Sequence, residues 1–132
     1  MHVTNFKSSF FIGAAVACSF VFCSVSPSLA DDLAAGKAVY EGAGACGTCH
    51  GPQGAGDGPA GAALTPKPRS FVTGDYSIDT DGDGTKGTET DIYNIVTNGA
   101  QKYGGSMMMV GRPDLSEENR HALAKYVLSL KK

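Results

Sequence analysis

The spacing of apolar residues predicts its clearest helix at the end of the chain. Leu123, Tyr126, Val127 and Leu130 recur at i, i+3, i+4 and i+7, which places them on one helix face. Ser116 precedes this segment and is a suitable N-cap residue. We therefore expect a helix that begins directly after residue 116 and buries this face.

Two more helices are predicted, over residues 31–44 and 89–98. In the first, Gly36 lies among apolar residues at helical spacing. A glycine inside a helix costs about 1 kcal/mol relative to alanine, so we expect Gly36 to permit the close approach of another helix. Before the second helix, Thr88 and Asp91 resemble a capping box.

Residues 51–76 have neither a helical nor a strand period and are rich in Gly and Pro. We expect an extended loop with at most a short helical turn near residues 60–64. A structureless loop of this length is unusual in a small domain unless something packs against it. A bound prosthetic group would fill that role.

The first thirty residues have the pattern of a secretory signal. A weakly basic start is followed by an apolar run over residues 10–25 and by a small-x-small cleavage signal that ends at Ala30. We predict cleavage after Ala30, which leaves residues 31–132 as one domain in the periplasm. Cleavage before Cys18 with lipid attachment, or an uncleaved anchor, would instead tether the protein to the membrane, facing the periplasm.

The pentad Cys-Gly-Thr-Cys-His at residues 46–50 is the strongest chemical signal in the chain. Two thiols at this spacing can each form a thioether to one of the two vinyl groups on a porphyrin edge. The histidine that follows then lies beneath the iron as its proximal ligand. We predict one covalently attached haem c per chain, held by Cys46 and Cys49 and ligated by His50.

Other uses of the pentad fit less well. A zinc site needs two further Cys or His ligands, and after residue 30 the sequence offers only His121. We expect His121, which lies off the apolar face of the last helix, to be a surface residue. A thioredoxin-like dithiol needs a βαβ context, and a disulfide within the pentad would leave His50 unexplained.

All methionines after residue 30 lie in one glycine-flanked loop, as Met107, Met108 and Met109. Core methionines would be spread along helices as gap fillers. A cluster on a loop suits a thioether that reaches the iron from the side opposite His50. Such His/Met ligation raises the reduction potential and favours electron transfer. The alternative is that all three pack elsewhere and the sixth iron site is open.

An acidic turn follows the long loop. Asp79, Asp81 and Asp83, with glycine at the sixth position, match the start of a calcium-binding loop. The twelfth position is Thr90 where a bidentate glutamate is expected, and the flanking helices of an EF-hand are missing. We expect a solvated turn, or at most a weak calcium site.

The charge of the chain restricts its partners. The formal net charge is −2 over the whole sequence, and loss of the leader with Lys7 makes it more negative. This argues against a nucleic-acid partner and against anionic membrane surfaces. It is compatible with a redox protein that carries a basic docking patch.

These features resemble the class I c-type cytochromes, and in particular small bacterial periplasmic mono-haem members. The likeness is carried by CGTCH, by the ending MVGRPDLSEENRHALAKYV and by GPQGAGDGPAG with LTPKPRSF. The resemblance implies an all-α fold of three to five helices around one covalently bound haem. Its N- and C-terminal helices would cross near Gly36 and Tyr126.

The resemblance also implies roles for loop residues. The carbonyl of Pro66 or Pro68 would accept the N–H of His50 and fix its ring. Arg69 would contact a haem propionate.

For the sixth ligand, the resemblance favours Met109, because Pro113 and Leu115 follow it where a common variant of the family has them. Met108 fits a longer variant, and Met107 is the third choice.

We therefore predict a monomeric one-electron carrier between periplasmic redox partners, with no membrane insertion of the mature chain. No distal acid–base pair can be read from the sequence, so we do not expect an enzyme. One alternative is a haem c subunit of a larger dehydrogenase, reductase or oxidase complex. Another is a haem-based sensor or ligand-binding protein with an open sixth site.

Overall fold

The computed structural model describes residues 28–132, so the predicted signal segment lies outside the described residues except for its last three positions. Within this range all regular elements are helices, which confirms the predicted all-α fold class. The elements are α1 (Leu29–Glu41), α2 (Gly47–His50), the 3-10 turn η1 (Gly61–Ala63), α3 (Glu89–Asn98), the 3-10 turn η2 (Ala100–Tyr103) and α4 (Glu117–Ser129). None of these helices is long and apolar enough to cross a membrane.

The starts of α3 and α4 follow from their capping residues. The Thr88 hydroxyl accepts the backbone N–H of Asp91, and the Asp91 carboxylate accepts that of Thr88, so the predicted capping box is present. The Ser116 hydroxyl accepts the N–H of Asn119 and begins α4 as expected. Gly99, at φ 83°, ends α3 in a conformation that favours glycine.

Helix α1 is displaced from its predicted range of 31–44. It begins at Leu29, because Ser28 forms a capping box with Asp31, and it ends at Glu41. The sequence from Gly42 to Ala45 leaves the helix, with Ala45 at φ 50°. The pentad is therefore entered through a tight turn rather than directly from the helix. The predicted cleavage point after Ala30 falls in the first turn of α1 and stays a prediction.

Helices α1 and α4 cross at the predicted contact. A Cβ added at Gly36 would lie 2.1 Å from the carbonyl oxygen of Ala122, so a hydrogen is the largest group that fits there. Beside the crossing, the rings of Tyr40 and Tyr126 meet edge to face with centroids 5.4 Å apart. Buried residues from α1, α3 and α4 form one continuous core around this crossing.

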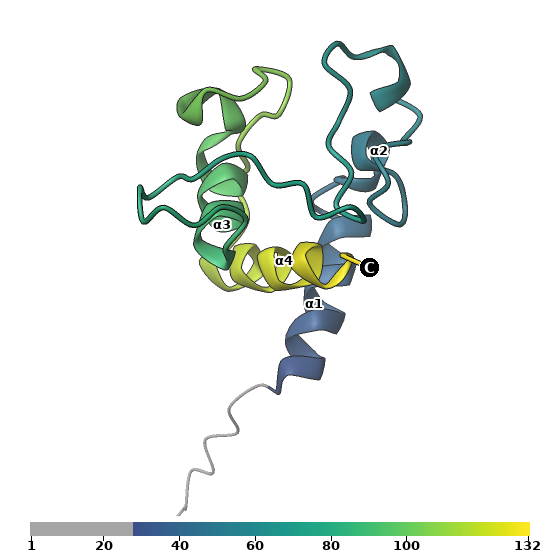
Figure 1. Cartoon of the computed structure of the whole chain (residues 1–132). Helices are drawn as coiled ribbons and strands as arrows, with labels where there is room; N and C mark the ends of the chain where they lie inside the picture. Colours follow the sequence, from purple (N-terminus) through teal and green to yellow (C-terminus); the bar gives the residue numbers. More distant parts are fainter. Residues whose placement is uncertain (1–27) are drawn as a thin grey trace, which may run out of the picture.

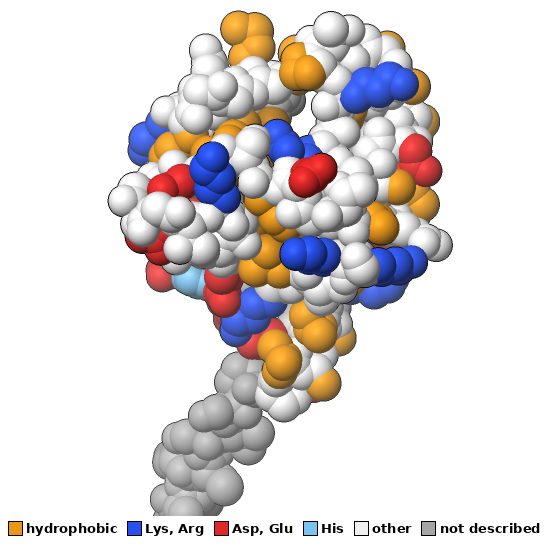
Figure 2. All heavy atoms as spheres, viewed as in Figure 1, with side chains coloured by type: hydrophobic (Ala, Val, Ile, Leu, Met, Phe, Trp, Pro, Cys, Tyr) orange, Lys and Arg blue, Asp and Glu red, His pale blue; other side chains and the backbone are white. Residues whose placement is uncertain are grey.

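Two walls stand on α4 and face each other (Figure 1). We call residues 46–71, which include α2 and η1, the attachment wall. Residues 89–112, with α3, η2 and the methionine loop, are the methionine wall. Helix α1 and helix α3 each pack on α4, which therefore forms the common base of both walls. Figure 2 shows the molecule hollowed between them.

Candidate haem site

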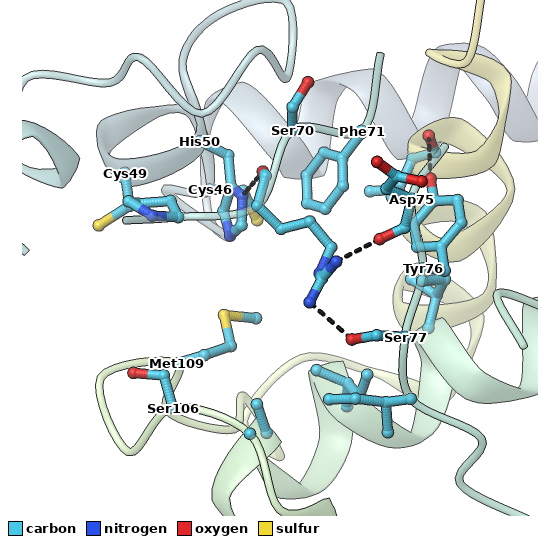
Figure 3. A pocket seen from close by; sticks show the side chains of 18 of the residues that line it. Cys46, Cys49, His50, Ser70, Phe71, Asp75, Tyr76, Ser77, Ser106 and Met109 are labelled. Carbon is cyan, nitrogen blue, oxygen red and sulfur yellow. Dashed lines mark hydrogen bonds between the residues drawn. The ribbon is translucent and has the colours of Figure 1, made fainter. Parts of the chain in front are cut away.

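The pentad forms its own helical turn, α2, at the base of the attachment wall. The N–H groups of Cys49 and His50 both donate to the carbonyl of Cys46, at 3.2 and 2.9 Å. This turn holds the two sulfurs and the imidazole next to one another, and no disulfide joins the two cysteines. The residues predicted to attach a haem are thus placed together on one face of the cavity (Figure 3).

The cavity between the walls has a volume of about 480 Å³, which is typical of small-molecule and cofactor sites. Its lining is mostly apolar, with Leu123 and Val127 of α4 at its base. Cys46, Cys49 and His50 line it from one wall, and Met108 and Met109 from the other. Two thiols, one imidazole and a thioether around an apolar space are the donor set that a covalent haem requires. The residues present therefore fit the predicted group.

The carbonyl that orients His50 belongs to Arg69. Its oxygen lies 2.9 Å from His50 Nδ1, so the prediction that Pro66 or Pro68 provides this acceptor is wrong. The Pro68 carbonyl instead faces Gly56, where an added Cβ would lie 2.6 Å from it. Both prolines line the cavity, and the acceptor follows Pro68 by one residue.

Phe71 packs against one face of the His50 ring. The two rings stack with centroids 4.4 Å apart and an interplanar angle of 21°. Burial lowers the pKa of His50, and the hydrogen bond to the Arg69 carbonyl opposes that shift only in part. The neutral imidazole is favoured, and with Nδ1–H donating to Arg69, Nε2 keeps its lone pair for a metal. The sequence contains no signal for the Phe71 contact.

The Arg69 side chain extends along the cavity (Figure 3). Its guanidinium donates to the carbonyl of Asp75 and to the hydroxyl of Ser77, the latter at 2.7 Å. These bonds join the end of the attachment wall to the segment that leads to α3. A positive charge is thus held at the cavity, and its contact with a propionate stays a prediction.

The three methionines differ in exposure. Met107 and Met108 are 66% and 55% exposed, whereas Met109 is partly buried. The Met109 carbonyl accepts the N–H of Ala100 at 3.0 Å, and its own N–H donates to the carbonyl of Ser106 at 3.2 Å. Figure 3 shows the Met109 thioether pointing into the cavity from the wall opposite His50. This arrangement favours Met109 and leaves Met108, which also lines the cavity, as the alternative.

The acidic turn has a different carboxylate set from the one predicted. Asp79, Asp81 and Asp91 place oxygens within 4.8 Å of one another, and Asp83 is not in this group. The Asp83 carboxylate accepts the N–H of Thr85 instead. The third carboxylate comes from α3, which the calcium-loop pattern does not cover. Calcium binding stays untested.

His121 lies on the surface of α4, away from the cavity, as the sequence predicts. Its ring stacks on Tyr93 with centroids 4.3 Å apart, and Nδ1 lies 3.0 Å from Glu89 Oε1. These contacts join α4 to the start of α3.

Comparison with known proteins supports the identification of this cavity as a haem site. Residues 33–131 match the family model described as Cytochrome c. The chain is also similar to a chain of the Kuenenia stuttgartiensis reducing HAO-like protein complex, with 31% identity and a TM-score of 0.60. That match covers 82% of this chain and 47% of the solved chain, so this protein spans about half of its length. No curated protein matches the sequence. The family match implies a haem c cofactor and haem-based electron transfer, and the chain belongs to the cytochrome c family.

Proposed function

We propose that the chain is a one-electron carrier that holds one haem c through thioethers of Cys46 and Cys49. His50 and Met109 are the axial ligands, with Met108 as the alternative to Met109. The observation that carries this proposal is the cavity, which has the complete pentad on one wall and a methionine thioether on the facing wall. When bound, the haem supplies a ferric/ferrous couple with both axial positions filled.

The residues of the chain support fast electron exchange rather than catalysis. The Arg69 carbonyl and the Phe71 ring hold His50 in one orientation, so the ligand does not rearrange between redox states. A thioether at the second axial position raises the reduction potential. The apolar lining excludes water, and the Arg69 guanidinium offers a donor for a propionate.

We place this carrier in the periplasm on the basis of the signal-like first thirty residues, and we propose that it acts as a monomer. Its donor and acceptor are redox proteins, and the acidic chain suits partners with basic docking patches. Calcium at the acidic turn is at most an accessory site.

Intact mass and an absorption spectrum of the exported protein test the assignment together. The expected mass is that of a chain that starts at Asp31 plus one haem. The reduced form should have a sharp low-spin spectrum, and the oxidised form a weak far-red charge-transfer band from methionine ligation. A colourless exported protein would contradict the proposal, and a haem protein without the far-red band would contradict the methionine ligand alone.

A second candidate is a haem c subunit of a larger redox complex. The similarity to a chain of the reducing HAO-like protein complex favours it, because that chain is about twice as long as the matched segment and belongs to an assembly. Size-exclusion chromatography of the native protein separates the two candidates. A free carrier runs near its monomer mass, whereas a subunit elutes with other chains.

A further inference from the structure

A side chain three residues after Met109 joins the two walls of the cavity. The guanidinium of Arg112 donates to the carbonyl of Ala43 at 2.7 Å and to that of Gly44 at 2.9 Å. Both carbonyls belong to the turn between α1 and Cys46, 69 and 68 positions away in sequence. Arg112 therefore connects the loop that carries the methionine to the turn that enters the pentad.

The guanidinium is held in one orientation for this contact. Its Nε and Nη2 donate to the two carboxylate oxygens of Asp114, at 2.9 and 2.8 Å. With the two carbonyls, four of its five N–H donors have acceptors. The backbone of Arg112 is fixed as well, because its N–H donates to the carbonyl of Val96 in α3 at 2.6 Å.

The turn that receives Arg112 is compact and lies against the first attachment cysteine. A Cβ added at Gly44 would lie 3.0 Å from the sulfur of Cys46 and 2.7 Å from the carbonyl oxygen of Val39. The turn is therefore in close contact with the attachment wall. The Arg112 bonds hold this turn and the methionine loop at a fixed separation.

The attachment wall follows α1 in the chain and the methionine wall begins with α3, so the Arg112 link joins walls that come from two different helices. Helices α1 and α3 each pack on α4, and the cavity opens between the walls above it (Figure 1). Separation of the walls would draw Met109 away from His50. Hydrogen bonds from a charged donor are about twice as strong as neutral ones, so the Arg112 bonds resist this separation.

We propose that Arg112 is a positioning residue for the sixth iron ligand. It holds the methionine loop at the separation from the pentad that a methionine–iron bond requires, and so controls how often that ligand dissociates. This inference depends on the proposed function, because it requires Met109, or its neighbour Met108, to bind the iron.

The test compares Arg112→Ala with wild type in the haem-loaded full chain. Carbon monoxide binds the reduced protein only while the methionine is off the iron, so its association rate reports the dissociated fraction. Loss of two charge-assisted hydrogen bonds should raise this rate about tenfold or more. When the Arg112→Ala variant is titrated with urea, its far-red band should disappear at a lower urea concentration than its helices unfold. Arg112→Lys should restore the slow carbon monoxide binding of wild type only in part. It keeps the positive charge, but an ammonium lacks the planar fork that engages both carbonyls and Asp114.

Lys125→Ala is the matched control. It removes one positive charge and the 2.5 Å ion pair between Lys125 and Asp32, which joins α4 to α1 away from the methionine loop. It should lower the melting temperature without accelerating carbon monoxide binding. The inference is overturned if Arg112→Ala binds carbon monoxide at the wild-type rate, or if Lys125→Ala accelerates binding equally. A wild-type protein without the far-red band would instead overturn the methionine assignment on which the inference depends.

Discussion

The two walls of the cavity are built in different ways. The attachment wall holds Cys46, Cys49 and His50 on one helical turn, with His50 fixed by a carbonyl at its Nδ1 and a ring stacked on its face. The methionine wall presents its ligand from a loop in which the two preceding methionines are exposed. One helical turn brings the attachment residues of the first wall together, whereas the methionine of the second wall depends on contacts from other parts of the chain.

This difference shows how a small domain can combine a covalent attachment of the haem with an axial ligand that can dissociate. Covalent attachment and a short helical turn need few contacts beyond the pentad itself. A ligand on a loop needs anchors, here the backbone bond of Met109 to Ala100 and the side-chain bonds of Arg112. We therefore expect substitutions in the attachment wall to decide whether haem is held. Substitutions in the methionine wall should decide whether the sixth ligand stays on the iron and what the reduction potential is.

The largest effect is expected from the double substitution Cys46→Ser and Cys49→Ser. Without both thiols no thioether can form, so the exported chain should lack the added mass of a haem. Intact mass spectrometry measures this directly. Thr48→Ser is the control, because Thr48 is an exposed residue of the same pentad and its change leaves both sulfurs in place. A double variant that still carried covalent haem would show that attachment occurs elsewhere.

Met109→Leu should keep the haem attached but remove the sixth ligand of the iron. Leucine has nearly the same volume as methionine, so the loop should fold at a cost below about 1.5 kcal/mol, but it offers no donor atom. We expect loss of the far-red band, rapid carbon monoxide binding and a lower reduction potential. Met107→Leu, at an exposed position, should leave all three unchanged. If Met108→Leu rather than Met109→Leu abolished the band, Met108 would be the ligand.

How far the sequence predicts this site depends on whether a feature is local in the chain or joins distant segments. The pentad and the caps at Thr88 and Ser116 are local patterns, so the sequence predicts them residue by residue. The close approach of another helix at Gly36 also follows from the sequence, and the family resemblance identifies that helix as the last one.

Contacts between distant loops could not be predicted in this way. The acceptor for His50 is Arg69 instead of a neighbouring proline, because the path of the loop decides which carbonyl faces the ring. The stack of Phe71 on His50 and the bonds of Arg112 to Ala43 also depend on loop paths. No periodicity or spacing in the sequence encodes them.

Gly36→Ala tests the base of the attachment wall. In an isolated helix the change would stabilise by about 1 kcal/mol. Here the added methyl would lie 2.1 Å from the Ala122 carbonyl oxygen and 2.7 Å from Tyr126 Cβ, so α1 must move away from α4. We expect a net loss of about 2 to 3 kcal/mol in the free energy of unfolding, measured by urea denaturation of the haem-loaded protein.

The control for this change is Ala35→Gly, at the adjacent exposed position of α1. It should cost about 1 kcal/mol through helix propensity alone. Stabilisation by Gly36→Ala would show that the two helices do not approach as closely as the structure places them.

Asp91→Asn tests the first turn of α3, where the methionine wall begins. Asp91 is 0% exposed, and its oxygens accept the N–H and hydroxyl groups of Thr80 and of Thr88. An amide would place an NH₂ group against donors on one side. The expected cost is about 2 kcal/mol, since hydrogen bonds to a charged group are broken. Asp83→Asn, at an exposed position outside this network, should change stability by less than about 0.5 kcal/mol.

The pH dependence of the stability loss in Asp91→Asn follows from the pKa of Asp91. Burial raises the pKa of Asp91, but the hydrogen bonds from Thr80 and Thr88 outweigh it and hold the pKa below the ordinary value of 3.8. A carboxyl with a lowered folded-state pKa contributes its stability above pH 3.8 and loses it as the pH falls through the folded-state value. Wild type and Asp91→Asn should therefore differ most at neutral pH and converge in acid. A difference that stayed constant down to the acid transition would mean that Asp91 acts through packing, and that charge has no part in holding α3 beneath the methionine loop.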